Sequence, residues 1–310
     1  MKTRTHTVDG NSDACFEEIR IAISSIRVCS ANILANLDGM PNRKPERKRE
    51  LNHLLNAVFK VGCDLLVLPE VSIPHCWLGE LGKWCREHDI GIVAGLEHQI
   101  DGDVAYNRAA TILPLVRNSG HRDCYSWLRL KRHYAPSEVT EITGRHLNVP
   151  SGSKQPYDLF SWRGAKFAVY NCYELASIEE RALFKAKVDF IVCSEFNRDI
   201  HYFSNIVESA ARDLHCYVIQ VNDSHYGDSR IVSPSKREQM DIVRFKGGEN
   251  TTFLRATLRL QALRKFQSFG HSLQQKQYHT NPDDGFKLTP PVWDRKEVRK
   301  RMLCPRGRRS

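Results

Sequence analysis

Three residues whose side chains can take part in nucleophilic chemistry each follow a segment that we expect to be a buried strand. They are Glu70, Lys131 and Cys172. A carboxylate at a strand end faces the rim of the sheet, where α/β enzymes place their sites, and a cysteine in the turn before a helix exposes its thiol beside free backbone N–H groups. Each residue taken singly also has a structural explanation: Glu70 as a helix cap, Lys131 as an ordinary charged strand exit and Cys172 as a small buried hydrophobe.

The elements that must position these residues alternate along the chain. Residues 50–60 are typical of the helices, because Leu51, Leu54, Leu55 and Val58 recur at helical spacing. We expect strands at 19–28, 64–68, 90–96, 107–115, 123–130, 157–162, 165–171, 190–193, 216–221, 230–232 and 252–260, and helices at 50–60, 78–88, 178–186 and 203–214. Strands separated by covering helices predict an α/β protein.

Composition and charge restrict the class of protein. The chain has 310 residues, of which 41% are hydrophobic and 26% charged, so a long disordered protein is excluded. Of the net charge of +10, the segment 294–310 carries +6, from eight basic and two acidic residues. We therefore expect a polar N-terminal extension (1–19), one domain (20–268) and a loose basic C-terminal tail (269–310).

Five segments together resemble the nitrilase superfamily, also called carbon–nitrogen hydrolases. The resemblance covers about residues 20–265. Its segments are Leu65-Leu66-Val67-Leu68-Pro69-Glu70, the run from Lys131 through Pro136 to Glu138, Cys172-Tyr173-Glu174, IVESAARDLHCYVIQVN at 206–222, and Gly227-Asp228-Ser229-Arg230-Ile231-Val232-Ser233-Pro234. The resemblance implies a four-layer α-β-β-α sandwich, commonly paired into homodimers or higher homo-oligomers.

The resemblance also implies a Glu–Lys–Cys triad formed by Glu70, Lys131 and Cys172. Glu70 would be the general base, Cys172 the nucleophile that forms a thioester, and Lys131 would stabilise negative charge on the substrate together with the backbone N–H of Tyr173. Glu138 resembles a second glutamate that orients the lysine and the substrate. The substrate would be a small molecule, with an amide or carbamoyl group preferred to a nitrile.

The chain departs from the family pattern after Val192, where Cys193-Ser194-Glu195-Phe196-Asn197-Arg198-Asp199 replaces a small, apolar stretch. Because family substrates are often met in this region, the family pattern does not determine the specificity of this chain. The candidate substrate-binding residues are Tyr134, Glu195, Phe196 and Asn197.

Two other classes of protein remain as alternatives. One is a catalytically silent binding module of this family, with its pocket blocked by Glu195, Phe196 or Arg198. The other is a nucleic-acid-associated protein in which the basic tail attracts RNA or DNA, although a solvated terminus explains the same charge more simply.

The sequence indicates no cofactor and no membrane segment. The implied chemistry needs no cofactor, and the grouping His75, Cys76, Cys85 and His88 matches no standard zinc spacing. No apolar run reaches the ~18 residues needed to span a bilayer, and no clean signal segment begins the chain. We therefore expect a cytoplasmic protein.

Overall fold

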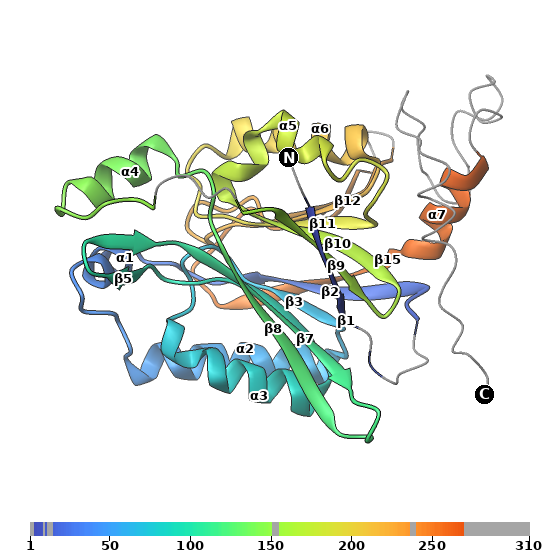
Figure 1. The fold of residues 1–310 in the computed structure, drawn as a ribbon, viewed down its shortest axis with the longest axis horizontal. Helices are drawn as coiled ribbons and strands as arrows, with labels where there is room; N and C mark the ends of the chain where they lie inside the picture. Colours follow the sequence, from blue (N-terminus) through green and yellow to red (C-terminus); the bar gives the residue numbers. More distant parts are fainter. Residues whose placement is uncertain (1–2, 9, 11–14, 151–154, 236–239, 270–310) are drawn as a thin grey trace.

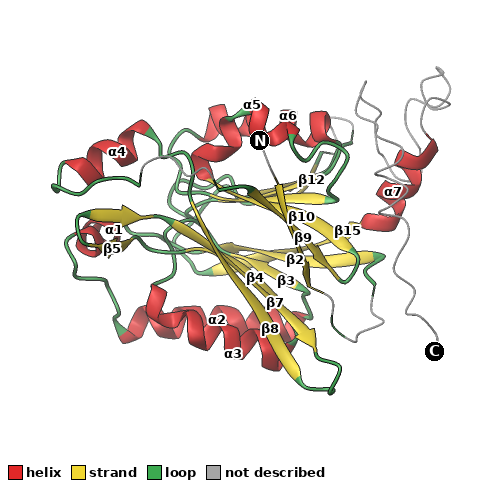
Figure 2. Ribbon diagram, in the orientation of Figure 1, coloured by secondary structure: helices red, strands yellow, loops and turns green. Residues whose placement is uncertain are grey.

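The computed structural model describes residues 3–8, 10, 15–150, 155–235 and 240–269 (Figure 1). Its centre is two β-sheets packed face to face, with helices on both outer faces. Figure 2 shows these four layers, which confirm the expected α-β-β-α sandwich. The segment 270–310, which includes nearly all of the expected basic tail, lies outside the described residues.

One sheet has seven strands and the other six, and each has neighbours that are far apart in sequence. The seven-stranded sheet has the order β1 (Thr3–Val8), β9 (Tyr157–Trp162), β10 (Ala165–Asn171), β11 (Phe190–Ser194), β12 (Tyr217–Val221), β13 (Arg230–Val232) and β14 (Asp241–Arg244). The six-stranded sheet has the order β15 (Thr252–Arg259), β2 (Glu18–Ser25), β3 (Leu65–Val67), β4 (Gly91–Gly95), β7 (Arg108–Val116) and β8 (Arg122–Leu130). The strands β5 (Gln99–Asp101) and β6 (Val104–Tyr106) form a separate hairpin.

The helices cover the sheets and connect their ends. Helices α2 (Pro45–Val61) and α3 (Leu78–His88) lie on the six-stranded sheet, and α5 (Ile178–Ala182) and α6 (Ile200–Leu214) lie on the seven-stranded sheet. The remaining elements are α1 (Ser30–Leu37), α4 (Pro136–Thr143), α7 (Leu260–Phe269) and the short 3₁₀ helices η1 (His75–Trp77) and η2 (Cys172–Ala176). The helix expected at 50–60 begins earlier than predicted, because Pro45 suits the first turn of a helix.

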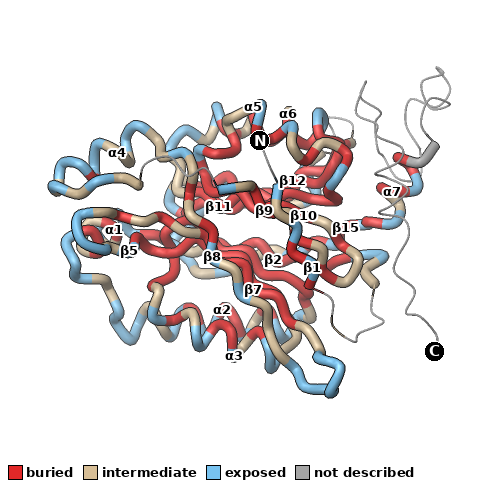
Figure 3. Tube along the Cα trace, viewed as in Figure 1, coloured by how far each residue is buried: buried red, intermediate tan, exposed pale blue. Residues whose placement is uncertain are grey.

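Three apolar layers hold the sandwich together. The central layer fills the space between the sheets and includes the stacked rings of Phe160, Phe167 and Phe190, with centroids 5.2 and 4.8 Å apart. Each outer layer lies between one sheet and its helices. Figure 3 shows the consequence: the central strands of both sheets are buried, and exposure is concentrated on outer helix faces, loops, hairpin tips and the edge strands β1, β8, β14 and β15. The strand ends are therefore held in fixed positions by packing on both faces.

Strand β1 was not expected, since it lies in the range assigned to a polar N-terminal extension. It pairs in parallel with β9, and alternate residues point inward, so that His6 and Val8 are buried while Thr5 and Thr7 are exposed. A hydropathy pattern misses this alternation because one of its inward residues is a histidine. The extension therefore contributes an edge strand of the sandwich.

His6 connects the edge strands of the two sheets. Its Nε2 donates to Asp158 Oδ1 at 2.7 Å, and its Nδ1 lies 2.6 Å from the Tyr125 hydroxyl on β8. Its ring also stacks on Phe160, with centroids 5.0 Å apart. These contacts close the sandwich along one side.

We expect His6→Ala to lower the free energy of unfolding by about 2–4 kcal/mol, because it removes two buried hydrogen bonds and aromatic packing. Urea denaturation measures the change. Thr5→Ala, on the exposed face of the same strand, should change the value by less than about 0.5 kcal/mol. Equal effects of the two substitutions would show that β1 does not contribute through His6.

Candidate active site

Cys172 is the first residue of η2, at the tight turn that directly follows β10. Its backbone has a φ of 47°, in the left-handed region that non-glycine residues rarely adopt, and its side chain is buried. Such local strain is concentrated at functional sites in proteins. Burial and Glu70 raise the pKa of the thiol well above its usual value, while Lys131 and the backbone N–H of Phe196 oppose them. The thiol therefore needs a base beside it to become a nucleophile.

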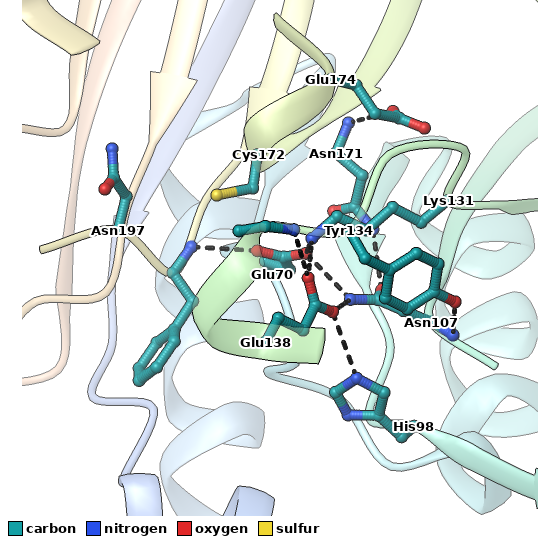
Figure 4. Close-up of polar contacts among 12 residues, drawn as sticks. Glu70, His98, Asn107, Lys131, Tyr134, Glu138, Asn171, Cys172, Glu174 and Asn197 are labelled. Atoms are coloured by element: carbon teal, nitrogen blue, oxygen red, sulfur yellow. Dashed lines mark hydrogen bonds and ion pairs between the residues drawn. The ribbon is translucent and has the colours of Figure 1, made fainter. Parts of the chain in front are cut away.

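Lys131 lies between two carboxylates. Its ammonium donates to Glu70 Oε1 at 2.7 Å and to Glu138 Oε2 at 2.5 Å (Figure 4). The side chains of Lys131 and Glu70 are almost completely buried, whereas that of Glu138 is 17% exposed. Burial alone would lower the pKa of Lys131, but Glu138 and Glu70 raise it well above its usual value. The lysine therefore remains a cation in the interior.

The two carboxylates have opposite pKa shifts. Burial raises the pKa of Glu70 above its usual range, although Lys131 opposes this shift. Burial acts on Glu138 in the same direction, but there Lys131 and His98 outweigh it and lower the pKa to about 2. Glu138 is therefore the permanent counter-ion of Lys131, and Glu70 retains the basicity that a general base requires.

Asn107, immediately before β7, organises this cluster and was not identified from the sequence. Its amide nitrogen donates to Glu70 Oε1 at 2.9 Å and to Glu138 Oε1 at 2.7 Å, and its Oδ1 accepts from Asn171 Nδ2 at 2.8 Å. Its backbone carbonyl also accepts from the backbone N–H of Lys131 at 2.8 Å. One asparagine thus fixes both carboxylates and reaches the residue before the cysteine. The only signal in the sequence was a polar residue at the start of a predicted strand.

A cavity of about 550 Å³ opens onto this cluster. Glu70, Lys131, Glu138 and Cys172 all line it, so the four residues that the sequence analysis placed at the centre of the site share one cavity. Figure 4 shows Glu70, Lys131 and Glu138 meeting beside Cys172. Among the described residues, no group of three or more His, Cys, Asp or Glu side chains could hold a metal ion.

The other candidate residues divide into two groups. Tyr173, Phe196 and Asn197 line the cavity. Tyr134 and Glu195 are not among its lining residues: the Tyr134 hydroxyl accepts from the Asn107 backbone N–H at 2.9 Å, and the Glu195 side chain is completely buried. Tyr134 therefore positions Asn107 in this structure.

Glu174 joins the cysteine turn to the strand end that carries Lys131. Its carboxylate accepts from the Arg129 guanidinium at 2.8 and 2.5 Å, from the Arg132 backbone N–H at 2.6 Å and from the Asn171 backbone N–H at 2.7 Å. The carboxylate is fully buried, and burial would raise its pKa, but Arg129 outweighs burial and lowers it. This charged clamp fixes the distance between the nucleophile and the lysine.

Comparison with known proteins identifies the family. The family model described as carbon-nitrogen hydrolase matches residues 26–266, and the chain belongs to this family. Members of this superfamily are generally enzymes. A search of curated protein sequences gives no match.

Solved structures of the nitrilase superfamily share the fold. Nit3 from Saccharomyces cerevisiae, a member of branch 10 of the superfamily, has a TM-score of 0.60 and 17% identity over 85% of this chain and 97% of its own. A mutant of an amidase from Nesterenkonia has a TM-score of 0.53 and 17% identity over 80% and 93% of the two chains. In another structure of that amidase, the acetamide moiety of fluoroacetamide is added covalently at the active-site cysteine.

We expect Glu174→Ala to lower the free energy of unfolding by about 3–5 kcal/mol, because it leaves the Arg129 charge buried without a partner. The pKa of Glu174 is lowered in the folded state, so its stabilisation is present above its ordinary value of 4.5 and is lost as the pH falls through the folded pKa. The difference between wild type and variant should therefore shrink in acid, as measured by urea denaturation at several pH values.

Glu179→Ala is the control for this prediction, since Glu179 lies in the same region of the chain but is exposed. It should change stability by less than about 0.5 kcal/mol. A pH-independent loss in Glu174→Ala would contradict the role of its charge.

Proposed function

We propose that the protein hydrolyses a non-peptide carbon–nitrogen bond, in an amide or carbamoyl compound rather than a nitrile, through a thioester on Cys172. The observation that carries this proposal is that Glu70, Lys131 and Cys172 line one cavity, with Lys131 bonded to Glu70. The covalent acetamide adduct on the cysteine of the Nesterenkonia amidase supports the choice of an amide.

In the first half of the reaction, Glu70 takes the proton from the Cys172 thiol as the sulfur attacks the substrate carbon. The negative charge that develops on the substrate oxygen is stabilised by the Lys131 ammonium and by the backbone N–H of Tyr173. Glu70 then gives its proton to the departing nitrogen, so ammonia or an amine leaves and the acyl group remains on the sulfur.

In the second half, Glu70 takes a proton from water, which attacks the thioester carbon. The carbon–sulfur bond breaks, the carboxylic acid is released and the proton returns to Cys172. Glu138 keeps Lys131 protonated throughout, since its own pKa is about 2 and its carboxylate remains charged. Glu70 can therefore accept and release a proton without losing the cation beside it.

The shape of the cavity favours an enzyme over a silent binding module. Phe196 and Arg198, two of the residues that would block a silent module, line the cavity, but the cavity still extends to Cys172. Its volume of about 550 Å³ lies in the range of small-molecule sites.

Intact-protein mass spectrometry tests the proposal. The protein is exposed to a panel of small amides, carbamoyl compounds and nitriles, and an acyl adduct on Cys172, confirmed by peptide mapping, is the expected result. The same panel with Cys172→Ala should give no adduct. Release of ammonia or amine without any dependence on Cys172, or an adduct on a different cysteine, would overturn the mechanism.

Substitutions should separate the roles of the three residues. Cys172→Ala should abolish turnover while leaving the thermal melt close to that of wild type, because it removes only the nucleophile. Glu70→Gln should also abolish turnover, since the shape is kept and the base is lost. Lys131→Met should lower kcat by ~10²–10³, the usual effect of losing one donor that stabilises transition-state charge.

The matched control is Cys216→Ser, since Cys216 is another buried cysteine, in the outer core of the same sheet. We expect this variant to retain the turnover of the wild type per folded molecule, with the folded fraction taken from its thermal melt. Wild-type turnover in Cys172→Ala would exclude the thioester mechanism.

A further inference from the structure

Glu195 is a buried carboxyl group for which the proposed mechanism has no use. It follows β11, and its side chain is completely inaccessible to solvent. Oε2 accepts a hydrogen bond from Gln220 Nε2 at 2.9 Å, whereas Oε1 is buried with no hydrogen-bond partner. A buried carboxylate of this kind has a high energetic cost unless it is paired with a cation or fully hydrogen-bonded.

The side chains that act on Glu195 offer no such cation. They are Gln220 on β12, Cys193 on β11, Glu70 after β3 and Asn197 after β11. Burial, and to a smaller extent Glu70, raise the pKa of Glu195 to about 8 against the opposing hydrogen bonds of Gln220, Cys193 and Asn197. Near neutral pH the carboxyl group is therefore predominantly uncharged.

The arginine that is hydrogen-bonded to Gln220 directs its charge elsewhere. Arg230 on β13 donates from Nε to Gln220 Oε1 at 3.3 Å. Its terminal nitrogens bond to Ser204, Glu208 and Asp241, so that its charge is balanced on the far side of Gln220. Lys131, the cation of the site, is occupied by Glu70 and Glu138.

Glu195 is directly connected to the reacting groups. Its backbone carbonyl accepts from the Glu70 backbone N–H at 3.3 Å, and the N–H of the next residue, Phe196, donates to Glu70 Oε2 at 3.2 Å. Burial and Glu70 raise the pKa of the Cys172 thiol, Lys131 lowers it, and Glu195 raises it. A negative charge on Glu195 therefore opposes formation of the Cys172 thiolate.

We propose that Glu195 is a positioning residue that must be uncharged for Cys172 to react, so that its ionisation sets the alkaline limit of the site. Its consequence for turnover rests on the proposed hydrolase function, but its effect on the thiol does not. Below the pKa of Glu195 the carboxyl group is neutral and the thiolate forms beside a dipole. As the pH rises through about 8, a buried anion appears near the sulfur and thiolate formation is suppressed.

The test is the rate at which iodoacetamide alkylates Cys172, followed by peptide mass spectrometry between about pH 6 and pH 10. Glu195→Gln keeps the shape and removes the ionisation. Below about pH 7 the variant and the wild type should react at rates within about twofold of each other, and above about pH 9 the variant should react about tenfold faster. A ratio of rates that stays constant with pH would overturn the proposal.

Glu208→Gln is the matched control, because Glu208 lies at the far end of the same network, on Arg230. The ratio of its Cys172 alkylation rate to that of the wild type should stay constant with pH. If Glu195→Gln does not fold, Gln220→Met provides a second test that keeps Glu195. Loss of the amide donor disfavours the ionised form of Glu195. Suppression of Cys172 alkylation should therefore begin at a higher pH than in the wild type. The same onset pH in both proteins would contradict the proposal.

Turnover distinguishes this inference from the proposed function. If the protein hydrolyses amides, kcat/KM of the wild type should fall above about pH 8, and this decline should move to higher pH in Glu195→Gln. If no substrate is hydrolysed but the alkylation ratio changes as expected, the proposed function fails and the role of Glu195 stands.

Discussion

The burial of Lys131 between Glu70 and Glu138 is the constraint on which the rest of the site depends. Three charged groups inside a protein are costly unless each is paired and hydrogen-bonded, and removing one leaves the others uncompensated. Here the lysine contacts both carboxylates. The Asn107 amide shares Oε1 of Glu70 with the lysine and donates to the second oxygen of Glu138, Oε1. The same arrangement gives the two carboxylates different roles, because Glu138 neutralises the Lys131 cation and Glu70 remains a base.

This cluster can form only where the two sheets meet. Glu70 and Lys131 follow β3 and β8 of the six-stranded sheet, whereas Cys172 and Phe196 follow β10 and β11 of the seven-stranded sheet. The apolar layer between the sheets therefore fixes the distance between nucleophile and base, even though none of its residues takes part in the reaction. A change in sheet packing would displace one half of the site relative to the other.

The sequence was sufficient to predict the layers and most strands, because each of these depends on local pattern or on a family motif. The three residues it named as a triad line one cavity, and their catalytic roles stay a prediction. The sequence did not identify Asn107 as a site residue, because its role depends on four contacts with residues distant in the chain. Strand β1 was missed because its inward side chain His6 is polar, and its burial depends on Asp158 and Tyr125. Tyr134 and Glu195 were identified as candidates, but a sequence cannot show whether a side chain faces a cavity or the interior.

Glu174 shows that stability and chemistry rest on the same groups in this fold. It satisfies the Arg129 charge and, at the same time, receives the backbone N–H groups of Arg132 and Asn171, the residues that flank Lys131 and Cys172 in the chain. A neutral residue of similar shape could not hold both segments, because four donors converge on its two oxygens. The strained turn at Cys172 is thus held by an ion pair, and the position of the thiol follows from electrostatics as well as from packing.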